Sequence, residues 1–161
     1  MNRKIAAGAA AGLVAGLAFD VTMRAIPART GGSMITFATA AVHSTHPLAG
    51  WLAYAVYGVL IGALFGWLMA NQTLDDGAAM VWGGLYGLGW WIVAGLVLLP
   101  VLRPAWPFST TAIDQAREVA FPLLIGHVVY GVILGWAWSE ITRRGSAQRP
   151  NAAPLPHRWA A

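Results

Sequence analysis

The chain has 161 residues, of which 58% are hydrophobic and only 10% are charged. A soluble globular domain has roughly 45 to 50% apolar and 25% charged residues, so this composition excludes an ordinary soluble domain and indicates a chain surrounded by lipid. The net charge of +4 does not indicate nucleic-acid binding, because the basic residues flank apolar stretches and form no long patch. The absence of cysteine excludes disulfides and thiolate metal sites.

Four apolar stretches are long enough to cross about 30 Å of hydrocarbon at about 1.5 Å per residue. In chain order they are residues 5–26, 50–70, 78–100 and 121–141. The first follows basic residues, as in a signal peptide, but its repeat partner lies in mid-chain. We therefore interpret it as a permanent span.

An internal repeat relates the two halves of the chain. Residues 56–62 read Val-Tyr-Gly-Val-Leu-Ile-Gly, and residues 129–135, 73 positions later, read Val-Tyr-Gly-Val-Ile-Leu-Gly. The same offset relates two further pairs, Gly16 with Gly89 and Pro27 with Pro100. The repeated unit therefore contains two apolar stretches and the loop between them.

These observations predict an all-α polytopic membrane protein. Four transmembrane helices form two parallel-repeat helical hairpins, residues 5–70 and 78–143, within a transmembrane domain of residues 1–144. Residues 145–161 contain several prolines and small residues and are expected to form a disordered tail.

Each of the two outer loops is predicted to contain a short helix. Ser33 is positioned to cap a helix over residues 34–42. Thr111, with Asp114 three residues later, forms a capping box before a helix over residues 112–120.

The distribution of basic residues predicts the orientation in the membrane. Four spans place both termini on one side, and the two terminal segments hold more arginine and lysine than the two long loops. We expect both termini to be cytoplasmic, in a bacterial inner membrane. The expected partners are the lipid bilayer and either a second copy of the chain or another membrane protein.

Glycines recur at four-residue spacing along the predicted spans. In lipid, helices associate where small residues let their backbones approach closely. The glycines expected at helix contacts are Gly12, Gly16, Gly58, Gly62, Gly66, Gly131 and Gly135.

A polar residue lies four positions further outward on three of these glycine faces. Gly16 leads to Asp20, Gly58 leads to Tyr54, and Gly131 leads to His127. Residues four apart share a helix face, so these side chains are expected to point into the bundle. Asp20 and His127 should lie about 8 to 10 Å inward from the outer ends of their spans, which would allow them to pair.

Two interpretations of this polar cluster remain open. An ionisable residue within a span is a functional-site hypothesis, because its burial is costly unless it is paired or hydrated. Alternatively, Asp20 forms an ion pair with Arg24 near the interface, and His127 binds a backbone carbonyl or Tyr54 and holds the helices in register.

Other chemistry has less support. His43 and His46 make an incomplete metal-ligand set, and a single intramembrane histidine does not make a haem site. No phosphate-binding loop or catalytic motif appears in the sequence. We therefore predict no catalytic residue, metal or cofactor, and an enzyme is the least supported class.

Several short motifs resemble the YagU-like family of small bacterial inner-membrane proteins and related four-span families. They are Ala11-Gly12-Leu13-Val14-Ala15-Gly16, the proline-rich stretch that follows, Glu118, Gly126-His127, and Trp138-Ser139-Glu140-Ile141 before Arg143-Arg144. The resemblance covers most of residues 10–144, although the outer loops are shorter than the family leads us to expect. It implies a bacterial inner-membrane location and supplies no reaction.

Two functional hypotheses follow. In the first, Asp20, Tyr54 and His127 form an outward-facing cluster that passes protons or a small solute, or senses external pH, since histidine beside a carboxylate can titrate in the physiological range. In the second, the chain is a structural or assembly subunit that binds another membrane protein through its glycine-rich helix faces.

Overall fold

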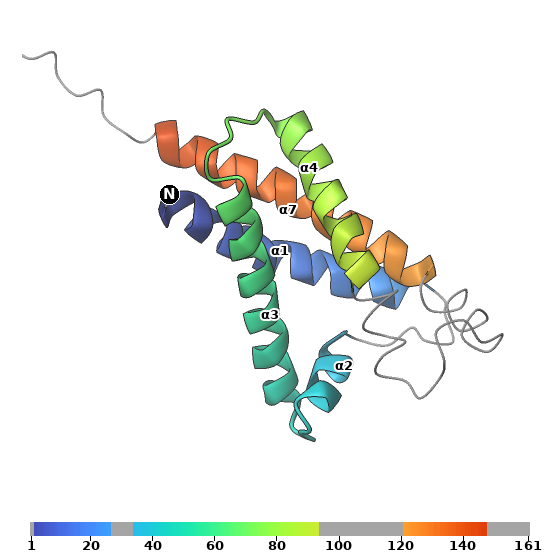
Figure 1. The fold of residues 1–161 in the computed structure, drawn as a ribbon. Coiled ribbons are helices and arrows are strands. Elements are labelled where there is room, and N and C mark those ends of the chain that lie inside the picture. The colour runs from blue at the N-terminus through green and yellow to red at the C-terminus, as the bar shows by residue number, and fades with distance from the viewer. Residues whose placement is uncertain (1, 27–33, 94–120, 148–161) are drawn as a thin grey trace, which may run out of the picture.

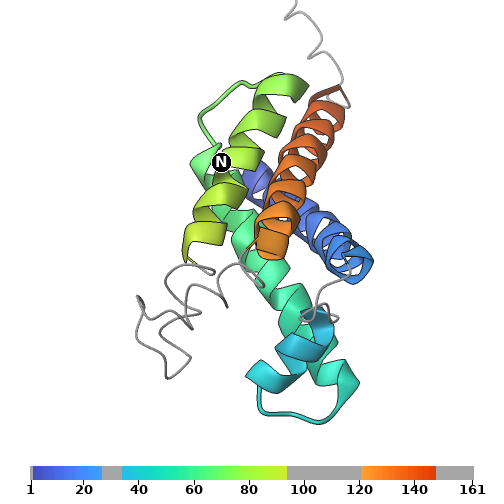
Figure 2. The same cartoon turned by 90° about the vertical axis from the view of Figure 1, so that its right-hand side faces the viewer.

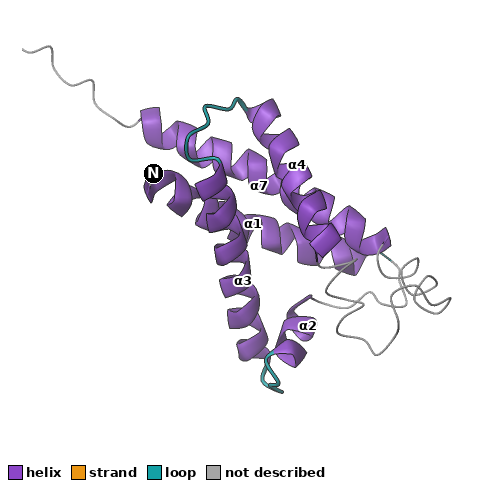
Figure 3. Cartoon of the chain, viewed as in Figure 1, coloured by secondary structure: helices purple, strands orange, loops and turns teal. Residues whose placement is uncertain are grey.

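The computed structural model describes residues 2–26, 34–93 and 121–147. All regular elements in these residues are helices, as Figure 3 shows. Three are long and apolar enough to cross a membrane: α1 (Asn2–Ala25), α3 (Pro47–Leu68) and α7 (Phe121–Ala147). The predicted helical class is confirmed for these residues.

The fourth predicted span is described only in part. α4 (Asp76–Trp91) has 16 residues. At about 1.5 Å per residue, a helix of this length reaches roughly 24 Å, less than the hydrocarbon thickness. The predicted span over residues 78–100 continues beyond the described residues, and the four-span topology therefore stays a prediction.

Local sequence explains where several helices begin. His46 is extended, and Pro47 occupies the first turn of α3, where an amide would have no intrahelical acceptor. Asp75 caps α4, because its side chain accepts a hydrogen bond of 2.7 Å from the Ala78 amide.

A short helix follows α1, as predicted. The hydrogen bond described at its first turn is accepted by a residue of α1, 14 positions earlier in the chain. α2 (Met34–Ala41) ends one residue before the predicted boundary. The Met34 amide donates a 2.7 Å hydrogen bond to Asp20 Oδ1 on α1. Ser33, the expected cap, and the predicted helix over residues 112–120 both lie outside the described residues.

The prediction of a disordered tail from residue 145 is wrong at its start. α7 continues to Ala147, and the Ser146 hydroxyl donates to the Thr142 carbonyl over 3.0 Å. Arg3 also donates to the Gly145 carbonyl over 3.2 Å. These bonds extend the helix beyond the apolar stretch, and the rest of the tail lies outside the described residues.

α1 lies between α3 and α7, and α4 packs along the other side of α7 (Figures 1 and 2). Among the described residues, the largest fully buried side chains are those of Phe65, Leu134 and Trp138. The half of α3 that begins at Pro47 extends away from α1, α4 and α7, with α2 beside it (Figure 1).

Glycines lie where α1 meets α3. A Cβ atom built on Gly12 would overlap the Gly58 carbonyl oxygen and lie 2.9 Å from Gly62 Cα. A Cβ atom on Gly8 would overlap the Gly62 carbonyl oxygen and lie 2.8 Å from Gly66 Cα. Backbone therefore touches backbone at this crossing, and any side chain larger than hydrogen would force the helices apart.

The contact between α4 and α7 has a similar arrangement. A Cβ atom on Gly83 would overlap the Gly131 carbonyl oxygen and lie 2.9 Å from the Gly135 nitrogen, and one on Gly135 would overlap the Ala79 carbonyl oxygen. Gly83 therefore faces the two glycines of α7 in the way that Gly12 faces Gly58 and Gly62.

The offset of 73 does not hold for the first helix of each half. Gly16 faces the Tyr54 ring, whereas a Cβ atom on Gly89 would meet no described atom within 4 Å. Gly87, 71 positions after Gly16, faces the His127 carbonyl instead. The predicted equivalence of Gly16 and Gly89 is therefore wrong, because the contacting glycines are two positions further apart in the second half: Gly83 and Gly131 are 48 positions apart, and Gly12 and Gly58 are 46.

Candidate functional site

Asp20 is buried near the end of α1, with 6% of its surface exposed. Its Oδ2 atom accepts a 2.7 Å hydrogen bond from Arg24 Nε, one helical turn later, and Arg24 is half exposed. Its Oδ1 atom accepts the Met34 amide of α2. The carboxylate thus joins α1 to the start of α2.

His127 is also buried, with 8% exposed, on the face of α7 that packs against α1. Its Nδ1 atom lies 2.8 Å from the Leu123 carbonyl oxygen of the same helix. Its ring meets the Phe19 ring edge to face, with 5.0 Å between centroids. Among the described residues, no hydrogen bond or ion pair joins His127 to Asp20.

The third member of the predicted cluster, Tyr54, bonds across helices. Its hydroxyl donates to the Gly16 carbonyl over 2.7 Å, so it links α3 to α1. The structure thus brings Asp20, Arg24, Tyr54 and His127 to one end of the bundle. Their described hydrogen bonds join each to its own helix or to a neighbouring backbone group, and no bond among them joins the carboxylate to the imidazole or the phenol.

Among the described residues, the buried hydroxyl of Tyr130 has no hydrogen-bond partner. Tyr130 is 7% exposed, its ring lies 6.3 Å from that of Phe19, and its hydroxyl oxygen is buried with no hydrogen bond. By contrast, the Tyr86 hydroxyl donates to the Ile61 carbonyl of α3 over 2.7 Å. A buried hydroxyl without a partner is destabilising, because it loses hydrogen bonds to water without replacement.

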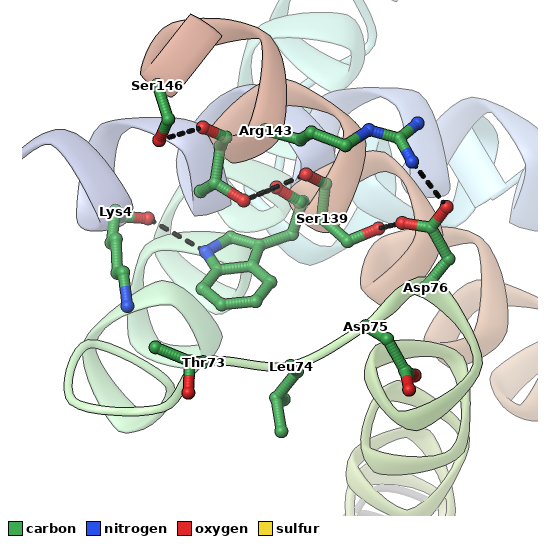
Figure 4. Close-up of a pocket in the computed structure, with 10 residues that line it drawn as sticks. Lys4, Thr73, Leu74, Asp75, Asp76, Ser139, Arg143 and Ser146 are labelled. Atoms are coloured by element: carbon green, nitrogen blue, oxygen red, sulfur yellow. Dashed lines mark hydrogen bonds and ion pairs between the residues drawn. The ribbon is translucent and has the colours of Figure 1, made fainter.

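A pocket lies at the opposite end of the bundle, where the start of α1, the turn between α3 and α4, and the end of α7 meet. It has a volume of about 380 Å³. We call it the terminal pocket, and its lining residues are Lys4, Thr73, Leu74, Asp75, Asp76, Trp138, Ser139, Thr142, Arg143 and Ser146 (Figure 4).

One wall of the terminal pocket is a network between α4 and α7. Asp76 accepts a 2.9 Å bond from the Ser139 hydroxyl and a 2.8 Å bond from Arg143. Arg143 and Arg144 both bond to Glu140. Figure 4 shows Ser139 and Arg143 converging on Asp76 from α7. Asp76 and Glu140 are therefore neutralised within the protein.

The other wall holds Lys4. Its ammonium donates to the Gln72 carbonyl over 2.6 Å and lies 5.8 Å from the centre of the Trp138 ring. The Trp138 indole donates in turn to the Lys4 carbonyl over 3.1 Å. Among the described residues, no carboxylate pairs with Lys4 and no cation pairs with Asp75.

The sequence analysis considered the basic residues, among them Lys4 and Arg143, only as flanks of the apolar stretches and did not predict this pocket. A signal was present, because Asp75 and Asp76 occupy the short turn on the same predicted side as both termini. Opposite charges on one side of a bundle indicate contact between the segments that carry them.

Comparison with protein-family models, with curated proteins and with solved structures finds no match to this chain.

Proposed function

We propose that this chain is an integral membrane protein of the bacterial inner membrane that acts as a structural or assembly subunit. Three apolar helices support membrane embedding. The hydrogen bonding of the predicted polar cluster supports a structural role, because Asp20, Tyr54 and His127 bond to backbone groups of the bundle. The bonds of Asp20 and Tyr54 join neighbouring helices and hold them in register, whereas the His127 bond stays within α7. None of the three makes a chain of groups for proton transfer.

The glycine faces expected to bind a partner are occupied within the protein. Gly12 packs against α3, and Gly83 packs against α7. We therefore propose that the partner contacts another surface, the apolar side of α3. In the apolar windows of the three long helices, only 28% is buried for α3, against 44% for each of the other two.

This surface of α3 is a continuous row of aliphatic side chains. Four of them, spaced four residues apart, are 56 to 62% exposed: Leu48, Leu52, Val56 and Leu60. Residues at this spacing share one helix face. The row suits contact with a helix of another membrane protein. It begins in the half of α3 that extends away from the rest of the bundle (Figure 1).

The four-span topology, the cytoplasmic termini and the kinship with YagU-like proteins belong to the same proposal. The described contacts support a shared side for the termini, because Arg3 at the start of α1 bonds to Gly145 near the end of α7. The duplication of a helix pair is supported by the matching glycine contacts of α1 with α3 and of α4 with α7.

Proton flux separates this function from proton passage. The full chain is reconstituted in liposomes with a pH gradient and a pH-sensitive dye, beside Asp20→Asn and His127→Ala. We expect flux no greater than in protein-free liposomes for all three. Flux carried by the wild type and reduced by either substitution would establish the passage hypothesis in place of the structural one.

Cross-linking tests the α3 surface. Because the chain has no cysteine, Leu52→Cys places one thiol in the proposed contact. Val81→Cys on α4, where Val81 is 63% exposed, is the matched control. In native membranes we expect Leu52→Cys to form a specific adduct with one partner, whose mass tells a second copy from another protein. Equal adducts from both positions, or none, would contradict the proposal.

A further inference from the structure

We propose that the terminal pocket binds the headgroup of an ethanolamine phospholipid, with the phosphate at Lys4 and the ammonium at Asp75. This inference rests on the proposed membrane location. Its basis is a pocket at headgroup depth that holds one cation and one anion without ionic partners among the described residues, on opposite sides (Figure 4).

The terminal pocket lies at the depth of the lipid headgroups. Trp67, Trp82 and Trp136 lie in the parts of α3, α4 and α7 nearest to the terminal pocket, and each is about half exposed. Exposed tryptophans collect at the level of the lipid headgroups. The terminal pocket is therefore placed where phosphate and amine groups of lipids lie, and not among acyl chains.

Lys4 is the cation of the proposed site. The Lys4 ammonium has three donors and gives one to the Gln72 carbonyl. The same ammonium lies over the Trp138 ring in a cation–π contact that holds it at the pocket wall. The remaining donors suit a phosphate oxygen, and basic pockets between transmembrane helices are known places for lipid headgroups.

Asp75 is the anion of the proposed site. Asp75 Oδ1 accepts the Ala78 amide as a helix cap, and Asp75 is exposed. A carboxylate has two oxygens and about four acceptor positions, so capping leaves acceptors for a primary ammonium. A choline headgroup has no N–H to donate, and a glycerol headgroup has no positive charge.

The charged residues that line the terminal pocket have no net charge. Asp76 and Arg143 neutralise each other, which leaves Lys4 and Asp75 as the charges that face a ligand. The two charges of the lining sum to zero, which disfavours a purely anionic ligand. A zwitterion complements this pair, because each of its charges meets the opposite one.

Native mass spectrometry of the full chain tests the assignment. The protein is released from vesicles that contain equal amounts of phosphatidylethanolamine, phosphatidylglycerol and phosphatidylcholine, and the retained lipids are counted. We expect the ethanolamine lipid to be retained preferentially. Lys4→Gln should reduce its retention about fivefold, the weight of one basic residue near a membrane surface.

Asp75→Asn isolates the role of the carboxylate. Asparagine caps a helix about as well as aspartate, so α4 should begin as before while the negative charge is lost. We expect this variant to lose the preference for ethanolamine over glycerol headgroups. Arg144→Gln is the matched control for Lys4→Gln, because it removes the same charge at the same end of the bundle but lies outside the pocket lining.

The outcomes separate this inference from the proposed function. Equal retention of the three lipids by the wild type, or equal effects of the pocket and control variants, would overturn the headgroup site while the protein still fractionates with membranes. Retention of soluble phosphoethanolamine without a lipid preference would also overturn the lipid assignment. A chain that is extracted from membranes by alkaline carbonate would instead overturn the proposed function.

Discussion

The polar side chains of the bundle are positioned by backbone groups at helix ends and crossings. Asp20 shows this most clearly, because its two oxygens bind Arg24 and the first amide of α2. A carboxylate that accepts a helix N-terminal amide also interacts favourably with the helix dipole. We interpret Asp20 as the residue that anchors α2 to α1.

Substitution of Asp20 should therefore detach α2. We expect Asp20→Ala to lower the free energy of unfolding by about 1 to 3 kcal/mol, as for a lost hydrogen bond to a charged group. Arg24→Gln should cost only about 0 to 1 kcal/mol, because Arg24 is half exposed. Denaturant titration in detergent micelles measures both, and equal losses would contradict the anchoring role.

Tyr54 and Tyr130 should respond differently to loss of the hydroxyl. Tyr130→Phe removes a buried hydroxyl without a partner, so we expect stability to be unchanged or higher. Tyr54→Phe removes the bond to Gly16, which should cost about 0.6 kcal/mol, the average for such bonds between membrane helices. Thermal unfolding followed by circular dichroism compares them, and a marked loss with Tyr130→Phe would reveal a partner for its hydroxyl.

Glycine spacing explains how the helices pair. The sequence pattern placed glycines at every fourth residue, and the structure puts Gly8, Gly12, Gly58, Gly62 and Gly66 where α1 and α3 cross. The pattern could not specify which two helices meet, because each span carries a similar row. The partner of each row depends on loop lengths and on the order of the helices.

Gly12→Ala should separate α1 from α3. The added methyl group would meet backbone atoms of Gly58 and Gly62, which cannot rotate away as a side chain can, so we expect a loss of about 1 to 3 kcal/mol. Gly89→Ala is the matched control, because it makes the same change within a helix. The methyl group that it adds would meet no described atom within 4 Å. Equal stability of the two variants would show that the crossing tolerates a wider spacing.

The architecture as a whole gathers three distant segments at one end. Arg3 and Gly145 are bonded although 142 positions separate them, and Lys4 binds both the α3–α4 turn and Trp138. The described start of α1, that turn and the end of α7 therefore lie together at one end of the bundle.

Cysteine labelling tests this arrangement. The chain has no natural cysteine, so single substitutions at Gln72, Ser146 and Val42 are labelled without background. With a membrane-impermeant maleimide, we expect Gln72→Cys and Ser146→Cys to react from the cytoplasmic side and Val42→Cys from the opposite side. Reaction of Gln72→Cys and Ser146→Cys from opposite sides would contradict the fold.

The long helices could be predicted from the sequence, because helix length and apolar character depend on local composition. Apolar length predicted the long helices, and Pro47 shows how a local residue marks a helix start. The pairing of Asp20 with Arg24 was predicted from their spacing of four residues. The Met34 amide that binds Asp20 and the Gln72 carbonyl that binds Lys4 were not predicted, because backbone groups have no sequence signature. The two-residue shift between the halves and the terminal pocket likewise arise from contacts between remote segments, which form only once the helices have packed.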